Sequence, residues 1–149
     1  MPPTTAPTLI LGTRKGLIVM ARGASGWRLV SEALPGVPVP YAVVDPRDGT
    51  LWVSEDHGHW GPKLSRSADG GRTVEAVPTP AYPEGALCKE EEAASNKFMW
   101  VIEPGPADRP GRLYIGTDPG GLFQSDDGGE TFELVSGFPP PIYSVRFMP

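Results

Sequence analysis

Short apolar segments alternate with clusters of glycine, proline and aspartate along the whole chain. The segments are rich in Val, Ile, Leu, Trp and Tyr, and the apolar spacing typical of a helix is nearly absent. Near the start of the chain the pattern gives candidate strands at residues 8–12, 17–21 and 27–30. The sequence therefore predicts an all-β protein in which short strands are joined by tight turns.

Two longer stretches, residues 41–77 and 99–135, repeat the same order of elements. Each contains a short strand, an Asp-Pro or Glu-Pro turn, a second strand, a loop, a third strand, an Asp-containing hairpin and a fourth strand. Four antiparallel strands per repeat is the blade of a β-propeller. The aligned pairs of segments are 41–46 with 99–104, 49–54 with 111–116, and 63–66 with 121–124.

Each repeat contains one copy of the pattern Ser-x-Asp-x-Gly-x-Thr followed by an apolar residue. The copies run over 67–74 and 125–132, and Asp127 follows Asp69 by 58 residues. Serine and aspartate side chains accept backbone N–H bonds in tight turns, and paired glycines supply positive φ. The pattern is therefore structural before it is functional. The residues expected to fix the two hairpins are Ser67, Asp69, Gly71, Thr73, Ser125, Asp127, Gly129 and Thr131.

The blade count is three, which is fewer than a closed ring contains. Residues 9–30 supply strands two to four of one blade, and residues 142–149 repeat the first strand and its proline. Closed propellers have about four to eight blades. We expect either a partial propeller that belongs to a longer chain, or self-association in which two copies complete a six-bladed ring.

Segments 9–17 and 120–129, Leu-Ile-Leu-Gly-Thr-Arg-Lys-Gly-Leu and Gly-Gly-Leu-Phe-Gln-Ser-Asp-Asp-Gly-Gly, resemble Asp-box (BNR-repeat) propellers of the sialidase-like superfamily. The resemblance covers roughly residues 9–149. It implies a repeat propeller, whose relatives include glycosyl hydrolase-like proteins and propellers with no glycosidase activity. It also implies that a ligand site lies on the face opposite the Asp boxes.

The loops expected on that opposite face supply the candidate ligand-binding residues. His57 and His59 flank a glycine beside Asp56, an arrangement that could bind a metal, orient a histidine for acid–base chemistry, or form an exposed loop. A two-residue histidine spacing without further ligands is a poor metal signature, so we predict no metal and no cofactor. The candidates are Arg14, Lys15, Asp56, His57, His59, Trp60, Tyr82, Glu84 and Asp118.

A sialidase active site would need a different set of residues. The resemblance implies an arginine triad, a tyrosine nucleophile paired with glutamate, and an aspartate acid–base. The Phe/Tyr-Arg-Ile-Pro signature is absent, and Tyr82 and Glu84 are close in sequence instead of coming from distant blades. We predict a ligand-binding or scaffold module without a demonstrable active site. The alternatives are an exo-sialidase-like glycoside hydrolase, complete only in a longer chain or a dimer, and a protein-interaction platform.

Composition and charge limit the kinds of partner that the protein is expected to bind. The chain has 149 residues, typical of one domain, and a net charge of −5 with scattered basic residues, which argues against nucleic acid. Cys88 is the single cysteine, so no internal disulfide forms. Residues 1–8 lack the basic and apolar regions of a signal peptide and are expected to be a disordered leader. No apolar run has transmembrane length. We expect a cytoplasmic protein with a small-molecule or glycan ligand and no membrane partner.

Overall fold

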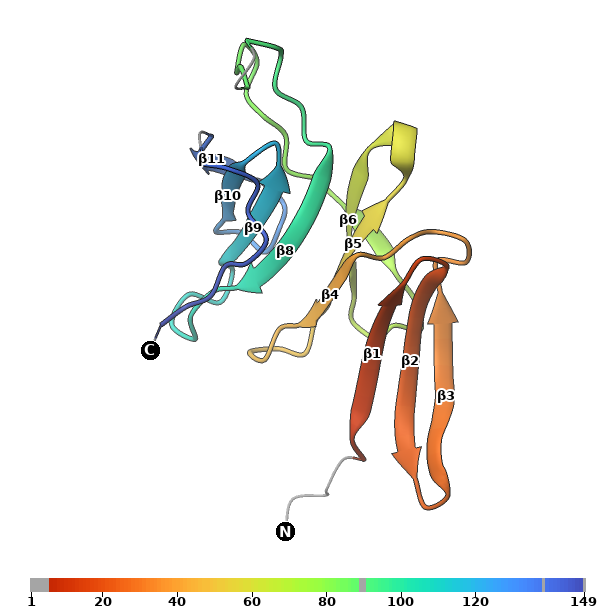
Figure 1. Ribbon diagram of the computed structural model, residues 1–149. Helices are drawn as coiled ribbons and strands as arrows, with labels where there is room; N and C mark the ends of the chain where they lie inside the picture. The colour runs from red at the N-terminus through yellow and green to blue at the C-terminus, as the bar shows by residue number, and fades with distance from the viewer. Residues whose placement is uncertain (1–5, 89–90, 138, 149) are drawn as a thin grey trace.

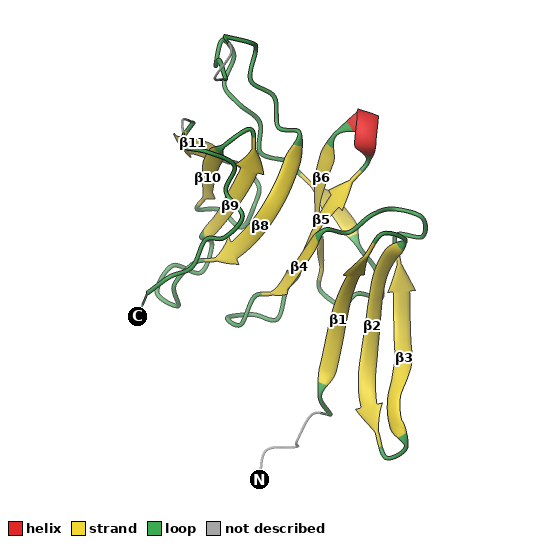
Figure 2. Cartoon of the chain, viewed as in Figure 1, coloured by secondary structure: helices red, strands yellow, loops and turns green. Residues whose placement is uncertain are grey.

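The computed structural model describes residues 6–88, 91–137 and 139–148, which form three antiparallel sheets (Figures 1 and 2). The first sheet has the order β1 (Thr8–Thr13), β2 (Gly16–Gly23), β3 (Gly26–Ala33). The second contains β4 (Tyr41–Val44), β5 (Leu51–Asp56), β6 (Pro62–Ser67) and β7 (Glu75–Val77), in that order. The third contains β8 (Phe98–Pro104), β9 (Leu113–Asp118), β10 (Gly121–Ser125) and β11 (Glu133–Ser136). One 3₁₀ turn, η1 (Gly58–Trp60), interrupts the strands. The prediction of an all-β fold is confirmed.

The strand boundaries differ slightly from the sequence pattern. The three N-terminal strands extend beyond the predicted segments 8–12, 17–21 and 27–30. Residues 142–148 are not in a strand of this chain, and Pro149 lies outside the described residues. The reason is that no second strand is within pairing reach of 142–148 among the described residues. They lie instead against the third sheet, where the Ile142 N–H points at the Thr117 carbonyl at 3.4 Å.

Two apolar cores hold neighbouring sheets together. Side chains alternate along a strand, so β5 sends Trp52 toward the third sheet and Leu51 and Val53 toward the first. Trp52 packs in a core with buried β9 and β10 side chains, among them Phe123, which is fully buried. Leu51 and Val53 pack against Leu17 of the first sheet. The second sheet therefore packs against a sheet on both faces, whereas each outer sheet packs against another sheet on one face only.

The hairpin between β6 and β7 is closed by its own side chains. The Ser67 hydroxyl donates to Asp69 Oδ1 (2.8 Å) and accepts the Gly71 N–H (2.9 Å). Asp69 Oδ1 also accepts the backbone N–H groups of Arg72 (3.0 Å) and Thr73 (2.9 Å), and Oδ2 accepts the Thr73 hydroxyl (2.6 Å). The carboxylate of Asp69 is thus fully occupied within its own turn.

The hairpin between β10 and β11 repeats these bonds one for one. Ser125 donates to Asp127 (2.8 Å), and Asp127 accepts the N–H and hydroxyl of Thr131 (2.9 and 2.5 Å). Donation from the threonine hydroxyl is the main cause that lowers the pKa of Asp69 and of Asp127 to about 2. Both aspartates are therefore structural parts of their turns.

Successive hairpins of an antiparallel meander emerge at alternate ends of the sheet. The two Asp-containing hairpins lie at one end, which we call the hairpin face. The β1–β2 turn (14–15), the β5–β6 loop (57–61) and the β9–β10 turn (119–120) lie at the other, which we call the loop face. The described parts of the linker between the second and third sheets, 78–88 and 91–97, extend beyond the same end (Figure 1).

Candidate functional site

The linker 78–97 is fastened to the β9–β10 turn by Tyr82. The Tyr82 hydroxyl donates to the Pro119 carbonyl (2.7 Å) and lies 3.2 Å from Thr117 Oγ1. Its ring packs edge-on against Phe123, with centroids 5.2 Å apart. Burial raises the pKa of the Tyr82 phenol. Gly121 permits this contact, because a Cβ there would collide with the Tyr82 hydroxyl.

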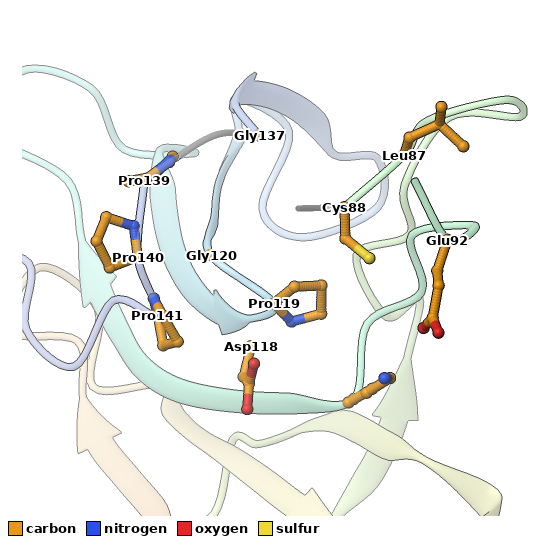
Figure 3. Close-up of a pocket in the computed structure, with 11 residues that line it drawn as sticks. Leu87, Cys88, Glu92, Asp118, Pro119, Gly120, Gly137, Pro139, Pro140 and Pro141 are labelled. Atoms are coloured by element: carbon orange, nitrogen blue, oxygen red, sulfur yellow. The ribbon is translucent and has the colours of Figure 1, made fainter. Parts of the chain in front are cut away.

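A pocket of about 530 Å³ opens beside this attachment (Figure 3). Its walls come from three parts of the chain that are distant in sequence: the linker, the start of the β9–β10 turn, and the segment after β11. Figure 3 shows Cys88 and Glu92 on one side, the three prolines on the opposite side, and Pro119 between them. The lining residues are Leu87, Cys88, Glu92, Lys97, Asp118, Pro119, Gly120, Gly137, Pro139, Pro140 and Pro141.

The pocket combines an apolar wall with a few charges. Its charged lining residues are Glu92, Lys97 and Asp118, and the half-buried Cys88 also lines it. Apolar walls with a small number of polar groups are typical of ligand sites. Gly120 shapes the wall, because any Cβ at this position would overlap the Pro139 carbonyl.

The histidine loop is organised differently from the expectation. His57 turns inward, with Nε2 2.7 Å from Oε2 of Glu55, whereas His59 is exposed and packs against Trp60 with ring centroids 5.4 Å apart. Asp56 accepts the Gly58 N–H at 2.8 Å. The interpretation in which Asp56 orients a histidine is therefore wrong, since Glu55 does so. Within the described ranges, no group of three potential metal-ligating side chains is found.

Glu55 is the residue that sequence reasoning missed. It is only 4% exposed, and its Oε1 accepts the hydroxyl of Ser65, which is 1% exposed. The alternation of Leu51, Val53 and Glu55 was the available signal, because it places a carboxylate on the face that packs toward the first sheet. Glu55 thereby joins β5, β6 and the histidine loop.

The remaining candidates lie apart from the 530 Å³ pocket. Arg14 and Lys15 are exposed in the β1–β2 turn, and Lys15 lines a separate pocket of about 370 Å³ that includes Glu32. Trp60 is 84% exposed and shares a third pocket, of about 330 Å³, with Tyr82. Glu84 is exposed on the linker. Of the predicted residues, the structure thus brings Asp118 to the 530 Å³ pocket and Tyr82 to its attachment.

The arrangement of sheets is that of a β-propeller, in which blades of four antiparallel strands stand side by side. No family model matches the sequence, and a search of curated proteins also found no match. Among solved structures, the chain is similar to "YCF48 bound to D1 peptide", a β-propeller, with a TM-score of 0.51 and 16% identity. The match covers 89% of this chain and 40% of that one, so the chain spans less than half of its length.

The likeness establishes the class of fold. The protein has a propeller-type all-β fold, of which the described residues form three sheets. None of the helical segments in the described part of the chain is long and apolar enough to cross a bilayer.

Proposed function

We propose that the chain is a propeller-type binding module that holds an extended peptide in the 530 Å³ pocket of the loop face. The observation that carries the proposal is the convergence of three distant segments on this pocket, fastened by the Tyr82–Pro119 bond. Binding residues commonly lie on loops held by a rigid scaffold. The similar propeller YCF48 is bound to a peptide, which supports a peptide in preference to the small molecule or glycan that the sequence suggested.

The lining indicates what kind of peptide fits. Its proline-rich apolar wall suits apolar side chains, and the carboxylates of Glu92 and Asp118 beside the ammonium of Lys97 suit a peptide that carries both signs of charge. We also propose that the hairpins are Asp boxes of the BNR type, supported by their one-for-one hydrogen bonds. The glycosidase alternative predicts turnover of a fluorogenic sialoside, and the binding-module proposal predicts none.

The single cysteine gives a direct test of occupancy. A random peptide library displayed on phage is selected against the protein, and the recovered peptides are synthesised. Each peptide at ten times its dissociation constant is expected to slow the reaction of Cys88 with Ellman's reagent about tenfold, because an occupied pocket shields the thiol.

Two variants make the test specific. Asp118→Lys should weaken the recovered peptides, whereas Lys15→Glu, in a pocket of its own, should leave their affinity unchanged. Peptides that bind without shielding Cys88, and whose affinity is indifferent to Asp118→Lys, would contradict a site in this pocket.

A further inference from the structure

We propose that the segment 142–148 of one chain pairs with the free edge of β1 in a second copy, so that two chains close a ring of six blades. The inference does not depend on which ligand the pocket binds. It rests on where the segment lies, on the unpaired edge of β1, and on the match between the two.

The segment 142–148 already occupies the place of a first strand. The Val39 carbonyl, just before β4, lies against Gly12 of the first sheet, and the Met99 carbonyl in β8 accepts the Ser54 hydroxyl of the second (3.0 Å). Ile142 continues the series on the third sheet, because a Cβ on Gly116 would come within 2.8 Å of its carbonyl oxygen.

Strands β1, β5 and β9 each take the second position in a four-stranded blade. Each contacted residue is the fourth of the apolar run in its strand, and these residues are Gly12, Ser54 and Gly116. The anchoring backbone bond recurs too. Val39 N–H donates to the Thr13 carbonyl at 2.8 Å, and Ile142 N–H is directed at the Thr117 carbonyl at 3.4 Å. The segment thus begins as β4 does.

Side chains hold the segment on the third sheet beyond this anchor. Tyr143 packs edge-on against Trp100, with ring centroids 4.9 Å apart, and Phe147 packs against Tyr114 at 5.4 Å. Arg146 reaches Glu103 at 3.1 Å. The segment is therefore docked by its side chains as a fourth blade's first strand would be. Among the described residues, no strand pairs with its backbone.

The outer edge of β1 lacks a partner strand, just as the segment 142–148 does, among the described residues. β1 is the outer strand of the first sheet, and within 6–88, 91–137 and 139–148 nothing pairs with its other side. Arg22 N–H donates to the Pro7 carbonyl, so the alternation of an antiparallel pair turns the backbone groups of Thr8, Ile10 and Gly12 toward the free edge. An extended strand with free N–H and C=O groups is a template for another strand.

Apolar side chains border both surfaces. Ile10 packs toward the second sheet, so Leu9 and Leu11 face the opposite way and are 42% and 37% exposed. On the far side of the molecule Tyr143 and Phe147 are 67% and 42% exposed. In one chain these surfaces lie at opposite ends of the row of sheets (Figure 1), so the segment of the same chain does not reach β1. A second copy brings them together through a head-to-tail contact, which gives a ring when the rotation closes.

The second sheet supplies the register. In it Tyr41 lies opposite Ser54 and Ala42 opposite Val53. At the new interface Ile142 is equivalent to Val39, and Gly12 is equivalent to Ser54. Val145 of one copy therefore takes the place of Ala42 and lies opposite Leu11 of the other copy, which takes the place of Val53. Leu11 bonds inward to β2, so this is a non-hydrogen-bonded pair, with Cα atoms about 4.5 Å apart, within the range of a disulfide.

A disulfide between two singly substituted chains tests the register. Leu11→Cys and Val145→Cys are made separately in a Cys88→Ala background, mixed, and oxidised. The expected result is a covalent dimer in the mixture and none in either variant alone. The mixture of Leu9→Cys with Val145→Cys is the matched control, because diagonal neighbours lie about 7–8 Å apart and do not bridge.

Light scattering of the unsubstituted chain supplies a second measurement that needs no variant. A mass of twice 15.9 kDa is expected. A folded monomer, an open assembly larger than a dimer, or a mixture that yields no more covalent dimer than its control overturns the proposal.

Discussion

The bond between Tyr82 and the β9–β10 turn is the most direct point at which to perturb the loop face. Tyr82→Phe removes the hydroxyl and keeps the ring against Phe123. The change deletes the 2.7 Å bond to the Pro119 carbonyl and the 3.2 Å contact with Thr117 Oγ1. Thr117 Oγ1 also bonds to Pro119 (2.9 Å), so neither partner is left without any bond.

The expected cost follows from this count. One neutral hydrogen bond contributes about 0.5–1.5 kcal/mol net, and the retained Thr117 bond avoids the larger penalty of an orphaned group. We therefore expect Tyr82→Phe to lower the free energy of unfolding by about 1 kcal/mol. Where the linker opens locally, the same loss raises its opening constant about fivefold.

Two measurements separate these effects. Urea unfolding followed by tryptophan fluorescence gives the global change, and the rate at which Cys88 reacts with Ellman's reagent reports local opening of the linker. Tyr143→Phe is the matched control, because Tyr143 is exposed and donates no hydroxyl bond among the described residues. If Tyr82→Phe left both measurements equal to those of Tyr143→Phe, the hydroxyl would not be what fastens the linker.

Three further predictions concern the hairpins and the buried carboxylate. Gly129→Ala puts a Cβ 2.9 Å from the Trp52 ring at φ +87°, whereas the Cβ of Gly128→Ala, at φ +76°, meets open space. Chemical denaturation should therefore show that the free energy of unfolding falls by about 1–2 kcal/mol for Gly128→Ala and by about 2–4 kcal/mol for Gly129→Ala. Equal losses would contradict the packing argument. Because folding lowers the pKa of Asp69 and Asp127 from 3.8 to about 2, the stability that they contribute is present above about pH 4 and is lost as the pH falls toward 2. Thermal melts from pH 5 to pH 2.5 should show a smaller fall for the Asp69→Ala/Asp127→Ala double variant than for the unsubstituted chain, and parallel falls would count against this. Glu55→Leu leaves the buried Ser65 hydroxyl without its acceptor and should cost about 1–3 kcal/mol in urea unfolding, with Glu55→Gln nearer the lower end; a more stable leucine variant would show that the polar contact is dispensable.

The sequence predicted those parts of the structure that depend on neighbouring residues. Each Asp-containing hairpin is closed by bonds that span at most four positions, so its pattern is visible in eight letters. The pocket, in contrast, depends on contacts between residues that are far apart in the sequence. Tyr82 meets Pro119 across 37 positions, and the prolines at 139–141 reach the pocket only because Gly120 leaves space for them. Such contacts follow from the packing of whole sheets, which no local pattern encodes.

The histidine loop shows the same limit in a smaller space. Sequence proximity joined Asp56 to the two histidines, but consecutive residues of a strand point to opposite faces, and the loop continues this divergence. The partner of His57 is Glu55, two positions back on the same face, and its other oxygen is held by Ser65 on the adjacent strand.

A polar side chain recurs at the loop-face end of β1, β5 and β9, the strands that take the second position in a blade. Its bond to the next strand explains how the repeat tolerates loops of different lengths. Thr13 donates to the Gly16 carbonyl at 2.8 Å, and Glu55 accepts the Ser65 hydroxyl. The Thr117 hydroxyl, which donates to Pro119 at 2.9 Å, also lies 3.3 Å from the Gly121 carbonyl. The ties join β1 to β2, β5 to β6 and β9 to β10, in each case just below the loop.

The loops above these ties have different lengths. Two are two-residue turns, 14–15 and 119–120, whereas the loop above Glu55 runs over 57–61 and includes η1. The longer loop follows the longer side chain, that of Glu55, which also lies 2.7 Å from the His57 ring. Because each tie fixes the ends of its loop, the loop itself is free to vary without loosening the sheet. The two Asp-containing hairpins differ from these loops, because they have the same length, 68–74 and 126–132, and repeat bond for bond. Above the ties, the connection between the second and third strands of a blade can therefore change its length, whereas these two hairpins keep theirs.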